Sequence, residues 1–174
     1  MTDESRFVIA VGSNIEPAAH LPAALEELVA ALEVERISPV FETPAVGAPG
    51  TPDFWNAAIL ARSPGSLEET KIRHLRPIES RLGRVRSSDR NAPRPIDLDL
   101  VLDLSSAGSG VEGRSLDPDL PRLAHLAVPV GDLVPLWRDP VSGRKLGDIA
   151  DSMRGGLVEV DAVGWDLPGL GDLS

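Results

Sequence analysis

The 174-residue sequence contains no cysteine, no tyrosine and only three histidines. The absence of cysteine excludes a disulfide scaffold, a thiolate nucleophile and cysteine-ligated zinc. His20, His74 and His125 are too far apart in the sequence for an HxH or HExxH zinc motif. No apolar run approaches the roughly 20 residues of a membrane span, and the polar, acidic start of the chain does not resemble a secretory signal. We therefore expect a soluble, cytoplasmic protein without a membrane partner.

Charge is distributed unevenly along the chain. The net charge of −10 argues against nucleic acid as a partner, because a phosphate backbone requires a basic face. Eight of the 17 basic residues nevertheless lie between Lys71 and Arg94, opposed only by Glu79 and Asp89, so that this segment carries +6 and the remainder −16. Such a segment suits a compact polyanion. A solvent-exposed helix face whose arginines pair with surface carboxylates would show the same cluster of basic residues.

Hydrophobic periodicity predicts four strands and two helices in the first 104 residues. In chain order they are strand 7–11, a helix capped by Ser13 or Asn14, strand 34–42, strand 54–61, helix 67–82 and strand 96–104. Two strands without an intervening helix exclude a purely doubly wound sheet. The βαββαβ order is the ferredoxin-like pattern, an α+β fold with a mostly antiparallel sheet and helices on one face.

Two prolines are expected to interrupt these predicted elements. Pro39 indicates an edge position or a bulge in strand 34–42, and Pro77 is expected to kink helix 67–82. That helix carries an apolar stripe predicted to be buried, formed by Ile72, Leu75, Ile78 and Leu82.

Short helices near 121–126, 130–133 and 145–153 would be C-terminal decoration. We expect one domain over residues 1–154, with 155–174 as an acidic, glycine-rich tail or an added edge strand.

Asp97 and Asp99 are the strongest candidates for chemistry. Residues i and i+2 of a strand share a face, with Cα atoms about 6.6 Å apart, so these carboxylates could share two Mg²⁺ ions roughly 3.5–4 Å apart. The alternative is that the aspartates form the solvent-exposed face of a strand whose Leu98, Leu100 and Leu102 face the core. The position of the pair favours the first interpretation, because it directly follows the arginine-rich loop 83–95 and arginine binds phosphate oxygens in bidentate fashion.

Residues 90–101, RNAPRPIDLDLV, also resemble the signature of the 6-hydroxymethyl-7,8-dihydropterin pyrophosphokinases. Four further segments resemble motifs of that family in the same order. They are GSN at 12–14, ETPAVG at 42–47, PDFWNA at 52–57 and ESRLGRVR at 79–86. The resemblance covers residues 7–104 and implies a ferredoxin-like fold, in agreement with the element order.

The resemblance implies transfer of pyrophosphate from ATP to the hydroxymethyl group of the pterin, a step of folate biosynthesis that releases AMP. The cofactor would be Mg²⁺, two ions held by Asp97 and Asp99, with ATP as co-substrate. Transfer would be direct, without a covalent enzyme intermediate. Catalytic roles fall on Arg84, Arg94, Asp97 and Asp99. The nucleotide would be bound by Arg76, Glu79, Arg84, Arg86, Arg94 and Ile96, and the pterin by Thr43, Pro44, Val46, Phe54 and Asn56.

The C-terminal half departs from the family pattern. Asp119 stands where the family has a histidine, and neither the family's later arginine nor its second stacking aromatic has a match. Trp137 or Trp165 could supply a replacement ring. Three other hypotheses are a degenerate ferredoxin-like module that binds nucleotide without turnover, a different Mg²⁺-dependent phosphotransferase, and a plain acidic domain. Retention of both aspartates argues against the module without turnover.

Overall fold

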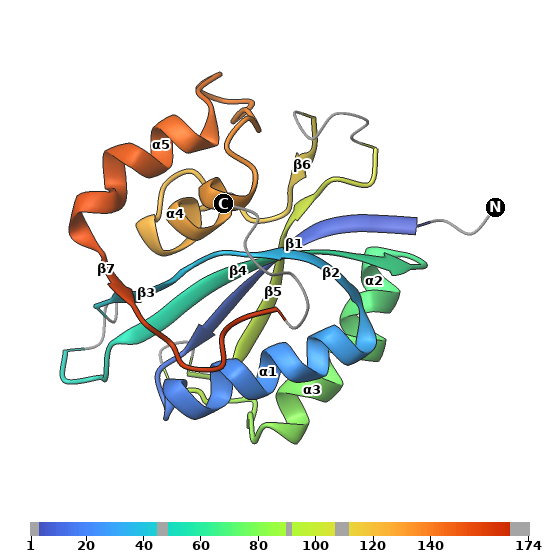
Figure 1. The fold of residues 1–174 in the computed structure, drawn as a ribbon, viewed down its shortest axis with the longest axis vertical. Helices are drawn as coiled ribbons and strands as arrows, with labels where there is room; N and C mark the ends of the chain where they lie inside the picture. The colour runs from blue at the N-terminus through green and yellow to red at the C-terminus, as the bar shows by residue number, and fades with distance from the viewer. Residues whose placement is uncertain (1–3, 45–48, 90–91, 107–111, 168–174) are drawn as a thin grey trace.

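The computed structural model describes residues 4–44, 49–89, 92–106 and 112–167 (Figure 1). In this part of the chain seven strands form one sheet with the order β6-β5-β1-β4-β3-β7, and β2 also pairs with β4. Every pairing between them is antiparallel. The strands are β1 (Glu4–Ser13), β2 (Glu33–Ile37), β3 (Val40–Thr43), β4 (Phe54–Pro64), β5 (Asp97–Asp103), β6 (Arg114–Ser115) and β7 (Val158–Val160).

Helices cover both faces of the sheet (Figure 1). One face carries α1 (Pro17–Ala31) and a second helical segment made of α2 (Leu67–Thr70), a π-helical turn (Lys71–Leu75) and α3 (Arg76–Arg81). The other face carries α4 (Ala124–Leu133), with α5 (Leu146–Met153) packed against it. The ferredoxin-like α+β prediction is confirmed. The C-terminal helices are more than decoration, however, because α4 closes the second face.

The alternating directions of the β1 side chains explain why helices must cover both faces of the sheet. Phe7 and Ile9 are fully buried in a cluster with α1 and α3, whereas Val8 is fully buried in a separate cluster with α4 and α5. Successive strand side chains point to opposite faces, so an uninterrupted apolar strand must bury both sides. The second cluster contains Trp137, whose indole nitrogen donates to the Gly113 carbonyl at 3.2 Å.

Pro39 divides the predicted strand 34–42 into β2 and β3. Proline has no N–H for the sheet ladder, and beside it the Ser38 hydroxyl accepts the Ala58 N–H at 2.8 Å. Both short strands then pair with β4, β2 with its C-terminal half and β3 with its N-terminal half. The prediction of an edge position or a bulge at Pro39 is therefore confirmed.

Pro77 affects its helix through the turn that precedes it. The π-helical turn is marked by the bond from the Arg76 N–H to the Lys71 carbonyl. This wider turn moves Ile72 out of the predicted buried stripe, and Ile72 is 50% exposed while Leu75 and Ile78 are buried. The prediction for Ile72 was wrong because it assumed an uninterrupted period of 3.6 residues.

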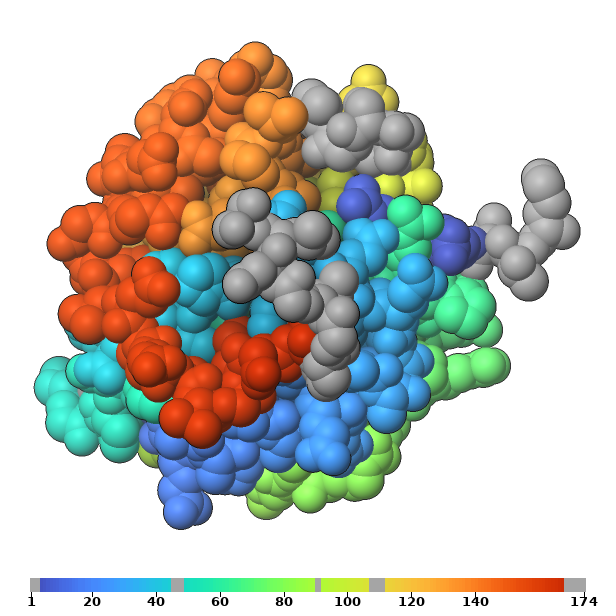
Figure 2. Space-filling model, viewed as in Figure 1, coloured from blue at the N-terminus to red at the C-terminus, as the bar shows by residue number. Residues whose placement is uncertain are grey.

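The C-terminal segment also joins the sheet. β7 pairs with β3, and beyond it Trp165 packs against the first core cluster and donates its indole N–H to the Ser38 carbonyl at 2.8 Å. Figure 2 shows this segment lying across the surface beside α1. Among the described residues, no helix is both long and apolar enough to cross a membrane.

Candidate active site

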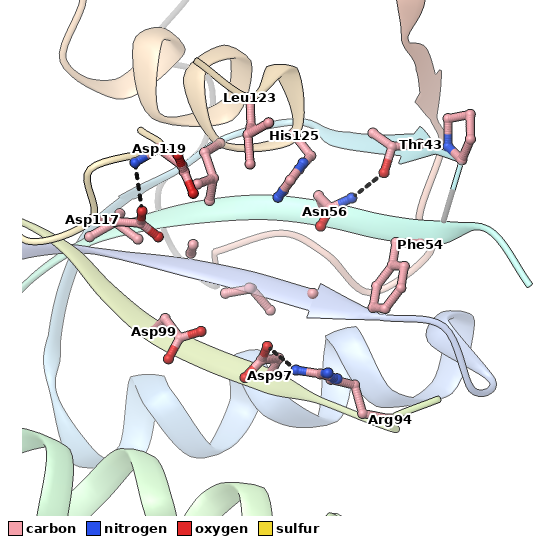
Figure 3. Close-up of a pocket in the computed structure, with 16 residues that line it drawn as sticks. Thr43, Phe54, Asn56, Arg94, Asp97, Asp99, Asp117, Asp119, Leu123 and His125 are labelled. Carbon is pink, nitrogen blue, oxygen red and sulfur yellow. Dashed lines mark hydrogen bonds and ion pairs between the residues drawn. The ribbon is translucent and has the colours of Figure 1, made fainter. Parts of the chain in front are cut away.

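A pocket of about 270 Å³ lies on the face of the sheet that α4 covers (Figure 3). Its floor is formed by β1, β3, β4 and β5, and its other wall by the segment from Asp117 to Leu126. Gly12 and Ala10 of β1 pair with Asp97 and Asp99 of β5, so the two positions beside the aspartates carry the smallest side chains. The sequence therefore leaves open space next to both carboxylates.

Asp97 and Asp99 share the pocket face of β5, as their spacing predicted, and Leu98 between them is buried in the opposite core cluster. Further along β5, the pairing with β1 shifts register between Val8 and Ile9, and Leu102 joins the same cluster as Val101. The expectation that Leu98, Leu100 and Leu102 share one face was wrong for Leu102, since a bulge changes the alternation.

Two arginines hold the Asp97 carboxylate. Arg84 pairs with Oδ1, and Arg94 donates to Oδ2 at 2.9 Å. Arg84 also pairs with Glu79, which is only 4% exposed and accepts the Leu98 N–H at 2.8 Å. Glu79 therefore connects the end of α3 with the start of β5 and positions Arg84 beside Asp97.

Burial changes the proton affinity of two acids in this cluster. Desolvation raises the pKa of Glu79 above its usual range, and the hydrogen bond from Leu98 and the charge of Arg84 oppose the effect only in part. Asp99 faces the pocket opening, but the surrounding protein partly desolvates its carboxyl and raises its pKa, as does the charge of Asp97. Only the second cause on Asp99, repulsion from the Asp97 charge, is one that a cation between the two carboxylates would relieve.

Arg84 owes its place to the way α3 ends. Gly83 adopts φ +91°, and its N–H donates to the Ser80 carbonyl at 3.1 Å, while the Arg84 N–H donates to the Glu79 carbonyl at 3.0 Å. These two bonds form the Schellman motif, in which a left-handed glycine reverses the chain after a helix. The reversal directs Arg84 back toward Glu79 and Asp97.

Arg94 is placed by Asn14, a residue for which the sequence suggested a different role. The Asn14 side-chain oxygen accepts the Arg94 N–H at 2.8 Å, and the Asn14 N–H donates to the Arg94 carbonyl at 3.2 Å. Asn14 is buried and does not cap α1, which begins after Glu16 without a side-chain cap. The prediction of a cap at Ser13 or Asn14 was wrong, because Asn14 instead joins the first strand to the arginine loop.

The far end of the pocket carries an amide and an aromatic ring. Asn56 donates to the Thr43 hydroxyl at 2.7 Å, and both residues are almost fully buried. Phe54 and Pro44 line the pocket beside them. A Cβ at Gly12 would lie 3.2 Å from the Asn56 oxygen, so glycine leaves room for the amide.

The other predicted site residues lie outside this group. Arg86 is mostly exposed and reaches Glu79 at 3.8 Å, and Arg76 is exposed on α3 away from the pocket lining. Ile96 is fully buried in the core and exposes no surface to a nucleotide. Val46 lies outside the described residues.

Asp117, Leu123 and His125 are among the lining residues that the sequence did not indicate. Asp119, which we noted only as a departure from the family pattern, lines it as well. The suggested replacement rings are elsewhere: Trp137 is in the second core cluster and Trp165 packs on the first. His125, at the start of α4, lines the pocket, and only the fold of α4 over the sheet brings it there.

The donor set is compatible with magnesium. Among the described residues no group of three or more histidine, cysteine or acidic side chains could hold a metal ion alone. Magnesium in phosphoryl-transfer sites is commonly bound by one or two carboxylates together with substrate phosphates, and Asp97 and Asp99 supply that number on one face.

A ferredoxin-like α+β fold with paired carboxylates and arginines at one pocket is the arrangement of an enzyme that transfers phosphorus-containing groups. The model of the 7,8-dihydro-6-hydroxymethylpterin-pyrophosphokinase family matches residues 8–133. The chain belongs to this family.

Relatives agree with this assignment. The 2-amino-4-hydroxy-6-hydroxymethyldihydropteridine pyrophosphokinase of Synechocystis sp. is 32% identical over 171 residues, which cover 93% of this chain and 83% of that protein. The Aquifex aeolicus protein of the same name is 30% identical over 95 residues, covering 54% of this chain and 58% of its own. A crystal structure of a triple mutant of Plasmodium falciparum HPPK-DHPS superposes with a TM-score of 0.64 at 10% identity. That match shares the fold and covers 87% of this chain but 44% of the Plasmodium chain.

Proposed function

We propose that this chain transfers pyrophosphate from ATP to the hydroxymethyl group of 6-hydroxymethyl-7,8-dihydropterin, with the described pocket as its active site. The observation that carries the proposal is the pair Asp97 and Asp99, which faces the same pocket as Arg94 and the Asn56 amide. One end of the pocket thus suits a metal-bound polyphosphate and the other a polar, flat ring.

The arginines would serve the nucleotide. Because Arg84 and Arg94 already contact Asp97, the approach of ATP phosphates allows each guanidinium to exchange a carboxylate oxygen for a phosphate oxygen. The exchange leaves the oxygens of Asp97 available for metal. Glu79 stays behind as the positioning residue for Arg84, and Asn14 does the same for Arg94. Arg86 and Arg76 are expected to approach the outer phosphates from solvent.

The substrate end would orient the acceptor. The Asn56 amide and the backbone near Thr43 would pair with the polar edge of the pterin, and Phe54 would pack on its ring. Pro44 and Val46 would complete this subsite. Orientation of the hydroxymethyl oxygen toward the β-phosphorus would be one contribution of this pocket to the rate.

The reaction would be a direct displacement. The 6-hydroxymethyl oxygen forms a bond to the β-phosphorus of ATP as the bond from that phosphorus to the α,β-bridging oxygen breaks, so AMP leaves and the hydroxyl proton is released. Bound at Asp97 and Asp99, two Mg²⁺ ions would neutralise charge on the transferring group. Arg84 and Arg94 add donors where negative charge develops.

The test is to incubate the protein with ATP, Mg²⁺ and 6-hydroxymethyl-7,8-dihydropterin and to identify the nucleotide product. We expect AMP that forms only when the pterin is present, together with the pterin diphosphate. Formation of ADP would contradict the proposal in favour of a different phosphotransferase. Tight ATP binding without turnover would contradict it in favour of a module that only binds nucleotide.

A further inference from the structure

A second cavity, of about 300 Å³, is lined by three parts of the C-terminal half of the chain. They are the segment between β6 and α4, the connection between α4 and α5, and α5 itself. The bond from the Trp137 indole to the Gly113 carbonyl holds the α4–α5 connection beside the start of β6 (Figure 1). We call this space the outer cavity. Its size is at the lower end for small-molecule sites.

The segment before α4 contributes different residues to the two cavities. Asp117 and Asp119 line the candidate active site, whereas Pro118 and Arg122 line the outer cavity. Leu120, between them, is fully buried in the second core cluster and anchors the segment. The two cavities therefore lie on either side of this segment and share no lining residue among those that the structure describes.

Much of the wall of the outer cavity is apolar. The apolar side chains come from all three parts of the lining, and they are Pro118, Pro121, Pro140, Val141, Ile149 and Met153. The prolines carry no N–H, so their backbone offers a ligand no hydrogen-bond donor. Val141 is 87% exposed at the edge of the cavity and would lose contact with water if a ligand bound there. Such a wall favours the carbon skeleton of a ligand.

The acidic residue in the lining, Asp139, already serves the fold. It is only 6% exposed, and its carboxylate accepts the Ser142 N–H at 2.9 Å and the Ser142 hydroxyl at 2.6 Å. The bond from the Ser142 hydroxyl is the main reason why the pKa of Asp139 lies below its usual range, so the group stays ionised. Asp139 therefore stabilises the turn that forms one wall, and its oxygens are not free to bind a cation.

Two arginines in the lining remain available to a ligand. Arg122 and Arg144 are exposed, and within the described part of the chain neither forms an ion pair with an acid at close range. Arg144 reaches the Asp148 carbonyl at 3.4 Å, and the charge of Arg122 acts on Asp139. With Asp139 counted, the described lining carries a charge of +1 on a protein whose net charge is −10. Guanidinium groups bind oxyanions through paired hydrogen bonds.

We propose that the outer cavity is a second ligand site, which binds a small organic anion. The apolar body of the ligand packs against the proline and methionine wall, and its single acidic group is bound by Arg122 and Arg144. The site lies in the C-terminal half, where the sequence departs from the family pattern, and outside the pocket assigned to ATP and the pterin. The proposal therefore does not depend on the proposed function.

The test uses 1-anilinonaphthalene-8-sulfonate, a probe with aromatic rings and one sulfonate whose fluorescence rises in an apolar site. N-Phenyl-1-naphthylamine has the same rings without the charge and is the matched ligand control. Both probes are titrated into the full chain in the presence of 6-hydroxymethyl-7,8-dihydropterin and a non-hydrolysable ATP analogue. We expect the charged probe to bind more tightly than the neutral one by about 10-fold or more, as expected for hydrogen bonds to a charged group.

Two variants locate the charged probe. Arg122→Gln and Arg144→Gln should each weaken its binding by about 10-fold or more and leave binding of the neutral probe unchanged. Arg73→Gln is the control, because it removes an exposed guanidinium from the π-helical turn on the opposite face of the sheet. It should change the affinity for neither probe. Melting temperatures near that of the wild type would show that each variant is folded.

Three results would overturn the proposal. They are equal affinity for the two probes, unchanged binding of the charged probe in both Arg122→Gln and Arg144→Gln, and loss of its binding when the pterin and the ATP analogue are added. The last result would place the probe in the candidate active site. Pterin-dependent AMP release enters none of these measurements, so the proposed function is tested separately.

Discussion

At the scale of single residues, Asp97 receives a guanidinium on each carboxylate oxygen, from Arg84 and from Arg94. Asp97→Asn keeps the size of the side chain but removes its charge, and with it the ability to bind metal strongly. We expect pterin-dependent AMP release to fall by on the order of 10²–10³-fold or more, the cost of removing one electrostatic group from an active site. Steady-state assays would measure this fall.

The variant should still fold, because Arg84 retains its contact with Glu79 and the buried side chains of β5 are unchanged. Asp103→Asn is the control for the same chemical change on the same strand. Asp103 bonds to Ser105 and Arg114 away from the pocket, so its loss should leave the rate unchanged. A rate near that of the wild type in Asp97→Asn would refute the metal assignment.

Glu79 yields a prediction about pH. Burial raises the pKa of Glu79, so the folded state binds its proton more tightly than the unfolded state does. Between the ordinary glutamate pKa and this raised value, the stability that the group contributes falls as pH rises. Glu79→Gln keeps an acceptor for the Leu98 N–H but cannot titrate. The wild type should therefore gain stability relative to Glu79→Gln on acidification from about pH 8 to about pH 5.

Urea unfolding in metal-free buffer measures this difference directly. Glu68→Gln serves as the control, because Glu68 is exposed in the first turn of α2 and lies outside the pocket lining. The opposite trend for Glu79, with the wild type losing relative stability on acidification, would mean that the hydrogen bond from Leu98 and the charge of Arg84 outweigh burial.

At the scale of elements, the turn after α3 decides where Arg84 lies. Gly83→Ala would place a side chain at φ +91°, which costs roughly 1–2 kcal/mol. In a chain of this size each kcal/mol lowers the melting temperature by about 2–4 °C. Relaxation of the strained turn would also move Arg84, so we expect KM for ATP to rise. Calorimetry and initial-rate kinetics would measure the two effects.

The control for this change is Gly155→Ala in the 3-10 turn after α5, where a Cβ meets no atom within 4 Å and φ is not positive. It should leave both the melting temperature and KM nearly unchanged. If Gly83→Ala had the KM for ATP of the wild type, the Schellman turn would not contribute to nucleotide binding.

Local sequence patterns predicted the elements well where local forces decide. The apolar runs of β1, β4 and β5 and the helix with the capping residue Ser66 were predictable because alternation and capping involve near neighbours. The positions of two irregular features could not be predicted in this way. The bulge opposite Val8 and Ile9 and the π-helical turn before Pro77 change the periodicity by one residue, and packing against other elements determines where that change falls.

At the scale of the whole molecule, the candidate site combines predictable and unpredictable parts. The residues in β5 and the arginine loop were indicated by motif and charge. Asn14 stood in a matched motif, but its bond to Arg94 was not predicted, and His125 was not indicated at all, because each reaches the site through a contact between distant segments. Asn14 meets Arg94 across 80 residues, and His125 enters only when α4 covers the sheet. No short-range pattern contains that information.

The last prediction concerns the C-terminal segment, for which the sequence left a tail or an added strand open. Trp165 lies partly buried on the first core cluster and bonds to the Ser38 carbonyl, while the pocket lies on the other face of the sheet. Trp165→Ala should therefore destabilise the fold by about 1–3 kcal/mol, less than the 3–5 kcal/mol of a fully buried tryptophan, and leave kcat/KM unchanged well below the melting temperature. Val163→Ala, 87% exposed in the same segment, is the control and should change neither quantity. If Trp165→Ala unfolds at the wild-type temperature, the segment is a surface tail that does not stabilise the fold. If the folded variant loses activity, a change on one face of the sheet alters the pocket on the other face, which the separate core clusters do not predict.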